Sequence, residues 1–253
     1  MRRAFSIVEL AVVMAVIAAL AAMIATAISG STGAARGASC TNHLRQFSVA
    51  AVAYSGDWEI YPPAIWWEQH DGVWREMAWD AVHEAGERVG DGVLWAYCDG
   101  SVHDTNCPEL DGPVDVRDPS SGYNYNTDYL GAEASFLQGL EDARPGVAPA
   151  ACRHPAQTAM FGDGGSISGD AAGFRTSRFM RAPVAEGDCL PCWGRQSYRH
   201  GGQTLVGWLD GHVGGVRTRA VDSCGECQDP SLFRDNGFLS ENTSPYDPSQ
   251  LIR

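Results

Sequence analysis

An uninterrupted apolar run near the N-terminus constrains this chain more than any other feature. From Phe5 to Ile28 the sequence reads FSIVELAVVMAVIAALAAMIATAI, and Glu9 is its only charged residue. As a helix rising about 1.5 Å per residue, this run would extend about 36 Å, enough to cross a hydrocarbon core of about 30 Å. We therefore expect one membrane-spanning helix at the start of the chain.

The charges flanking the run indicate its orientation. Arg2 and Arg3 precede it, and the next basic residue is Arg36. Because basic residues favour the cytoplasmic side, we expect a cytoplasmic N-terminus, a single pass of the inner membrane and a head outside the cytoplasm. A cleaved signal peptide is the alternative, but its apolar core would be only about 7–15 residues long and would lack Glu9.

The remaining sequence has the composition of a globular domain. Of 253 residues, 44% are hydrophobic and 19% charged, which disfavours wholesale disorder. The formal net charge of −13 argues against nucleic acid as a partner. All 18 basic residues are Arg, so mechanisms that need a Lys amine, such as a Schiff base or a P-loop, are excluded.

Glu9 carries the most specific signal, because a carboxylate within a membrane span is costly and indicates a functional partner. The segment resembles the N-terminal signature of type IV pilins and pseudopilins, in which a basic leader is cut before a Phe and Glu occupies the fifth mature position. Residues 1–4 would be the leader, with Ala4 where the family usually has Gly, and Phe5 would be the first mature residue. The resemblance implies cleavage and N-methylation by a prepilin peptidase. It also implies that Glu9 pairs with the Phe5 ammonium of a neighbouring subunit.

Beyond the apolar run, Gly30, Gly33 and Gly37 predict a bend or break. Apolar residues then recur at helical spacing, which predicts a second helical segment from about Cys40 to Tyr54. We expect residues 5–29 to form a transmembrane or filament-core helix and residues 30–253 an extracytoplasmic pilin-like head. The expected fold class is α+β, a long N-terminal helix packed by its second half against an antiparallel β-sheet, in a loop-rich head stapled by disulfides.

Residues 199–216, RHGGQTLVGWLDGHVGGV, predict a β-hairpin, because Asp210-Gly211 favours a two-residue turn between the flanking apolar runs. His200 stands nine residues before Asp210-Gly211, which resembles the His-(nine residues)-Asp-Gly motif of a prepilin-like family abundant in planctomycetes. Further blocks occur in that family's order: Cys40-Thr-Asn-His-Leu-Arg-Gln46, Tyr61-Pro-Pro63, Cys107-Pro108, Tyr123-Asn-Tyr-Asn126 and Phe161-Gly-Asp163.

Two interpretations of the hairpin motif remain open. His200, Asp210 and His212 could converge on a metal ion, because imidazole and carboxylate groups are suitable ligands. Alternatively, Asp210 shapes the turn and both imidazoles are hydrogen-bonded or exposed, which we favour. The sequence contains no Gly-x-Ser-x-Gly, His-Glu-x-x-His or phosphate-binding glycine motif, so we expect neither an enzyme nor a bound cofactor.

Eight cysteines, an even number, favour disulfides in a head outside the cytoplasm. They are Cys40, Cys98, Cys107, Cys152, Cys189, Cys192, Cys224 and Cys227. The last four form a doubled Cys-x-x-Cys, which leaves a four-thiolate zinc site and a redox pair open as alternatives. Cys40 and Cys107 both lie in blocks shared with the prepilin-like family, and that resemblance implies a pair tying the helix to the head.

Other segments carry weaker indications. Six of the eight Trp lie between Trp58 and Trp95, either as an aromatic platform for glycans or a neighbouring subunit, or as core residues, which we favour. The run YNYNTDYLG, starting at Tyr123, could form an edge strand. The tail from Ser240 is polar and should be peripheral.

The sequence thus predicts a structural subunit, pilin-like or pseudopilin-like and plausibly minor or accessory, of a type IV pilus or a type II secretion filament. Its expected partners are a prepilin peptidase, other pilin-like subunits and, before assembly, the inner membrane. The alternative is an inner-membrane-anchored extracytoplasmic protein that binds a glycan or a metal. Substitution of Glu9 distinguishes the two, because only a filament subunit should need this carboxylate for assembly.

Overall fold

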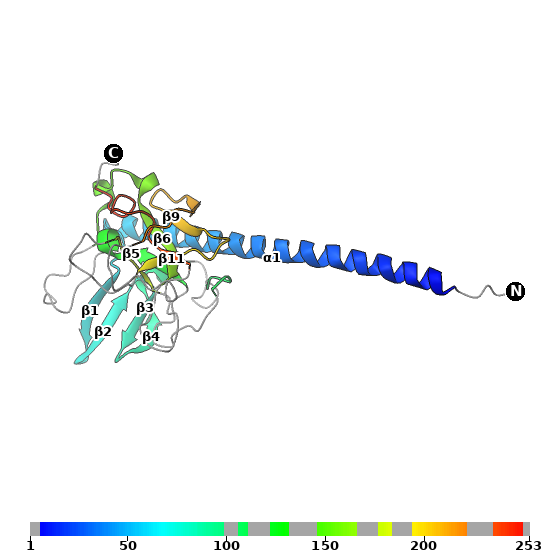
Figure 1. Cartoon of the computed structure of the whole chain (residues 1–253). Coiled ribbons are helices and arrows are strands. Elements are labelled where there is room, and N and C mark those ends of the chain that lie inside the picture. The colour runs from blue at the N-terminus through cyan, green and yellow to red at the C-terminus, as the bar shows by residue number, and fades with distance from the viewer. Residues whose placement is uncertain are drawn as a thin grey trace.

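A single long helix dominates the protein. The computed structural model describes residues 6–98, 106–110, 122–131, 146–165, 177–183, 194–221 and 235–249. Helix α1 (Ile7–Trp58) has 52 residues, so it extends about 78 Å at 1.5 Å per residue. Figure 1 shows its first half projecting from the head as a rod, while its second half lies within the head. The expected α+β class, with an N-terminal helix and antiparallel sheets, is confirmed. The expected disulfide staple is not shown, because the four cysteines among the described residues, Cys40, Cys98, Cys107 and Cys152, are all free thiols.

Both ends of α1 are capped. Ser6 is the N-cap: its hydroxyl accepts a hydrogen bond from the Val8 N–H (3.1 Å), and its own N–H donates to Glu9 Oε2 (2.9 Å). This reciprocal pair is a capping box, which satisfies two otherwise unpaired backbone donors. At the other end Glu59 adopts a left-handed conformation (φ 62°), and its N–H donates to the Ser55 carbonyl.

The predicted bend or break between Gly30 and Gly37 is wrong, because α1 runs through this segment without interruption. A glycine in a helix interior costs only about 1 kcal/mol, which neighbouring helix formers offset. Among the described residues, nothing beyond the helix's own backbone lies within 4 Å of a Cβ placed at Gly33 or Gly37, so no tertiary contact from them crowds the helix at these two positions. Among the residues of α1 whose burial is described, Cys40 is the first that is fully buried.

The two halves of α1 differ sharply in burial. None of the residues from Ile7 to Ala25 is buried, although all but Glu9 are apolar. By length and composition this segment could cross a membrane, as expected. In the second half Leu44, Phe47 and Ala51 are fully buried against the head.

Among the described residues the strands form two sheets. The first is an antiparallel meander of β1 (Ile65–His70), β2 (Val73–Ala78), β3 (Ala81–Glu84) and β4 (Glu87–Asp91). The second runs in the order β10 (Val213–Val216), β9 (Thr204–Trp208), β6 (Ala159–Gly165), β5 (Tyr123–Asn126), β7 (Phe179–Met180); β8 (Arg195–Ser197) pairs with β6 and with β11 (Asn236–Gly237). Only the β5–β7 pair is parallel among these described pairs. The short helices are η1 (Val93–Tyr97), η3 (Thr127–Gly131), η5 (Pro149–Ala151) and η6 (Pro155–Gln157).

The predicted hairpin is confirmed, because β9 and β10 pair antiparallel across the turn that contains Gly211. The predicted edge strand is wrong: β5 lies between β6 and β7, and all four of its residues are buried. The tail is less peripheral than expected, since Tyr246 is fully buried and its hydroxyl accepts a hydrogen bond from the Leu239 N–H.

The core forms where α1 meets the sheets and η1. The ring of Phe47 has four aromatic neighbours at centroid distances of 5.3–5.8 Å: Trp79, Trp95, Tyr123 and Phe161. Trp79 and Trp95 are buried, and each indole N–H donates to a backbone carbonyl, which is the core arrangement we favoured. Trp58 and Trp74 are exposed instead, so this interpretation holds for only part of the Trp-rich segment.

Candidate functional site

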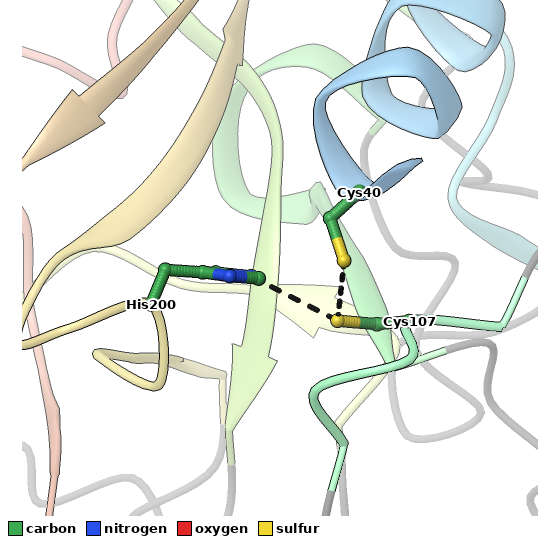
Figure 2. Close-up of side chains that lie close together, drawn as sticks. All are labelled: Cys40, Cys107 and His200. Atoms are coloured by element: carbon green, nitrogen blue, oxygen red, sulfur yellow. Dashed lines mark hydrogen bonds between the residues drawn. The ribbon is translucent and has the colours of Figure 1, made fainter. Parts of the chain in front are cut away.

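Three distant parts of the chain meet at a buried cluster of two cysteines and a histidine. Cys40 comes from α1, Cys107 from the segment 106–110, and His200 from the turn between β8 and β9; Figure 2 shows their side chains pointing toward one another. The Cys40 and Cys107 sulfurs are 2.8 Å apart, and His200 Nε2 is 3.8 Å from the Cys107 sulfur. Cys40 is fully buried and Cys107 is 3% exposed.

Two charged side chains complete this cluster. Arg199 Nε donates to the Cys107 sulfur (3.2 Å), and Arg199 Nη2 donates to Asp163 Oδ1 (3.0 Å). The other Asp163 oxygen lies 3.3 Å from His200 Nε2 and accepts the Leu205 N–H (2.7 Å). Buried charges are retained in proteins when they are paired in this way. We call these residues the cysteine cluster: Cys40, Cys107, Asp163, Arg199 and His200.

Local backbone geometry places Arg199 and His200. The His200 N–H donates to the Gln203 carbonyl, and the Gln203 N–H donates back to the His200 carbonyl, which closes a tight turn. The two residues between them, Gly201 and Gly202, have φ values of 61° and 77°. Glycine occupies such left-handed positions without steric cost, so the Gly-Gly pair after His200 allows the chain to turn sharply into β9. The pairing of β9 with β6 then brings this turn beside Asp163.

The contacts within the cysteine cluster shift the pKa values of both thiols and of the His200 imidazole. The hydrogen bond from Cys40 lowers the pKa of the Cys107 thiol well below its ordinary value, against the effect of burial, and His200 and Arg199 lower it further. The same hydrogen bond and burial raise the pKa of the Cys40 thiol. Burial works against a charged His200, but Asp163 and Cys107 outweigh it and raise the pKa of this imidazole to about 9. These shifts favour the thiolate form of Cys107 and the protonated form of His200.

The positions of the two sulfurs and of the His200 ring favour a disulfide bond over a zinc site or a nucleophile relay. Two thiolates bound to one tetrahedral zinc, each about 2.3 Å from the metal, would lie about 3.8 Å apart, whereas these sulfurs are 2.8 Å apart. A nucleophile relay needs the two ring nitrogens of His200 to face different partners, yet Nε2 is the nitrogen near both Cys107 and Asp163. A disulfide bond of about 2.05 Å requires only that the sulfurs approach by less than 1 Å.

The structure does not bring His200 together with Asp210 and His212, so their metal hypothesis is not supported. Asp210 and His212 lie at the β9–β10 turn, where Asp210 Oδ1 is 2.5 Å from His212 Nδ1 and accepts the His212 N–H (3.1 Å). The turn itself differs from the predicted two-residue type: Gly211 has a φ of 88°, but Asp210 does not have a positive φ, and β9 ends at Trp208 while β10 begins at Val213. Among the described residues, the group that could hold a metal is Cys40, Cys107 and His200.

The remaining predicted residues are placed as follows. Cys98 and Cys152 are half-buried and lie outside the cysteine cluster. Ala4 and Phe5 fall outside the described residues, as do Cys189, Cys192, Cys224 and Cys227, and with them the predicted zinc site of the doubled Cys-x-x-Cys. Glu9 is exposed in the first turn of α1.

Sequence reasoning missed two members of the cysteine cluster, Asp163 and Arg199. Each stood in a block noted for its pattern, Asp163 within Phe161-Gly-Asp163 and Arg199 directly before His200. A charged residue inside an otherwise apolar or glycine-rich run was the available signal, because buried charges require partners. No family model, curated protein or solved structure matches this chain.

Proposed function

We propose that this chain is a pilin-like or pseudopilin-like subunit, which a prepilin peptidase processes and which assembles from the inner membrane into a type IV pilus or type II secretion filament. One observation carries the proposal: a continuous 52-residue helix is exposed and apolar in its first half and forms the head core with its second half. A helix that is apolar all round needs lipid or other helices around it. A filament core built from such helices supplies them after the subunit leaves the membrane.

Glu9 supports assembly rather than simple anchoring. Its carboxylate lies in the apolar half of α1, where an unpaired charge is costly. One oxygen accepts the Ser6 N–H within its own chain, and a carboxylate has capacity for further donors. The ammonium of mature Phe5 on a neighbouring subunit would neutralise it and fix the axial register between helices.

The first test is the chemical identity of the mature chain. Protein sheared from native cells should be recovered in a filament fraction, and intact mass with N-terminal sequencing should give N-methylated Phe5 as its first residue. A chain that retains Met1 or Arg2 and remains in the inner membrane would overturn the proposal.

The capping box allows a sharper test of Glu9. Glutamine can replace glutamate in a capping box, so Glu9→Gln keeps the cap and removes the charge, whereas Ser6→Ala removes the cap and keeps the charge. We expect Glu9→Gln and Glu9→Ala to abolish recovery in the filament fraction, and Ser6→Ala to be tolerated, with the head folded in all three by circular dichroism. Assembly of Glu9→Gln at the wild-type level would mean that Glu9 only caps the helix.

The same assignment places the head outside the cytoplasm, and we propose that Cys40 and Cys107 are joined there as a disulfide. The Cys107 thiolate attacks a disulfide of an extracytoplasmic oxidase protein, and the Cys40 sulfur then displaces that protein from the mixed disulfide. Two electrons and the Cys40 proton pass to the oxidant, which leaves with its disulfide reduced to one thiol and one thiolate. The bond ties the second half of α1 to the segment 106–110, at the point where the helix enters the head.

A further inference from the structure

A pocket of about 460 Å³ lies on the first sheet, away from the cysteine cluster. Its lining includes Trp67 on β1, Trp74 and Glu76 on β2, His83 on β3, and Arg178, which directly precedes β7. Sites for small ligands commonly have volumes of about 300–1,000 Å³ and combine aromatic walls with a few polar groups, as this pocket does.

Strand register explains why these side chains share a face. Trp67 is directly opposite Glu76, and Glu76 is directly opposite His83, so the three form a row across β1, β2 and β3. Trp74 precedes Glu76 by two residues on the same strand, which puts both on the same side of the sheet. Trp66 is on β1 next to Trp67 and therefore faces the opposite side, where its indole N–H donates to Glu68.

Arg178 enters this face from the second sheet and is held in place by its backbone. Its carbonyl accepts hydrogen bonds from Trp79 Nε1 and from the Tyr125 N–H, both 3.0 Å long. Its guanidinium forms an ion pair with Glu76, and Nη1 is 3.3 Å from His83 Nδ1. The side chain of Arg178 is only 7% exposed, so it is held in position before any ligand binds. We call Arg178, Glu76 and His83 the polar floor of the pocket.

We propose that this pocket binds a neutral saccharide. An indole offers a flat apolar surface against which the C–H face of a sugar ring can pack, and Trp74 is 38% exposed and accessible to it. Sugar hydroxyls both donate and accept hydrogen bonds, so they match a floor that has the Glu76 carboxylate as acceptor and the Arg178 guanidinium as donor.

Charge decides among the ligand classes that an aromatic pocket could take. An anion would meet the Glu76 carboxylate, and a cation would meet the Arg178 guanidinium, at the same polar floor. A neutral polyol meets no like charge and can use both groups. The saccharide site is independent of the filament assignment, since it depends only on the β1–β3 face and Arg178.

The test uses the full-length chain in lipid nanodiscs, because a detergent with a sugar headgroup would compete for the pocket. Cellobiose, maltose and chitobiose are titrated by isothermal calorimetry into the wild type and into Trp67→Ala, Trp74→Ala and Trp66→Ala. Trp66→Ala is the matched control, since it removes the neighbouring indole from the other side of the same strand. Circular dichroism and thermal melting confirm that each variant is folded.

We expect at least one of these disaccharides to bind saturably to the wild type. Loss of either pocket indole removes apolar contact area and should weaken binding by about tenfold or more, while Trp66→Ala binds as the wild type does. Cellobionic acid, which carries a carboxylate, should bind more weakly than cellobiose. The proposal is overturned if the wild type binds none of the three disaccharides, or if Trp66→Ala loses binding as fully as Trp74→Ala.

Discussion

A disulfide between Cys40 and Cys107 would make the stability of the head depend on redox state, by an amount that follows from the chain. The two residues are 67 apart in sequence, and closing a loop of that length stabilises a fold by about 4 kcal/mol in the chain-entropy account. For a domain of about 200 residues, each kcal/mol shifts the melting temperature by about 2–4 °C. Breaking this bond alone should therefore lower the melting temperature by about 8–16 °C.

The assay compares thermal melts with and without reductant in the wild type and in four single variants. Cys40→Ala and Cys107→Ala should each melt lower than the wild type under oxidising conditions and should lose this part of the response to reductant. Cys98→Ala and Cys152→Ala are the matched controls and should retain it, because neither residue belongs to the cysteine cluster. A non-reducing peptide map should join the Cys40 peptide to the Cys107 peptide.

The disulfide is ruled out if the response to reductant in Cys40→Ala and Cys107→Ala equals that of the wild type. It is ruled out equally if alkylation followed by intact mass shows both thiols free in protein from native cells. The two sulfurs would then be a hydrogen-bonded pair, and the 2.8 Å contact would stabilise the head only as a buried polar interaction.

Three further predictions test the core, the site and the hairpin. Phe47→Ala should lower the free energy of unfolding of the head in urea by about 3–5 kcal/mol, because Phe47 is fully buried among four aromatic rings. The control Val49→Ala, on the exposed side of α1, should change it by less than about 0.5 kcal/mol. In the reduced protein the lowered pKa of Cys107 should leave thiolate absorbance in the ultraviolet at about pH 6, where an ordinary cysteine is protonated, and Cys107→Ser should remove it; identical spectra would contradict the charge distribution. Gly211→Ala should cost about 1–2 kcal/mol because of its φ of 88°, and an unchanged melting temperature would mean that the turn can relax.

The elements that sequence could predict are those set by local pattern. The apolar run, the helical spacing from Cys40 onward and the hairpin around Asp210-Gly211 each depend on neighbours within a few residues, and all three appear in the structure, the hairpin with a longer turn than predicted. The break at Gly30–Gly37 was mispredicted because each glycine destabilises a helix by only about 1 kcal/mol, which is too little to interrupt a long helix.

The candidate site was less accessible to sequence reasoning, because long-range pairing assembles it. Asp163 reaches His200 only through the alignment of β6 with β9, and no spacing along the chain indicates that alignment. The position of β5 inside its sheet depends likewise on β7, whose two residues give almost no strand signal. The spacing of His200 from Asp210-Gly211 singled out this histidine in the sequence, whereas its contact with Cys107 is visible only in three dimensions.

The continuity of α1 couples the azimuth of the head to that of the apolar half of the helix. A rigid helix turns about 100° and rises about 1.5 Å per residue, so one residue inserted between Ala25 and Cys40 would swing the head by about 100° around the axis. Seven inserted residues would restore its azimuth to within about 20° while lifting it about 10 Å. The length of the helical segment between the apolar half and the head therefore fixes two things together: the distance of the head from the apolar half, and the direction in which the head faces around the helix axis.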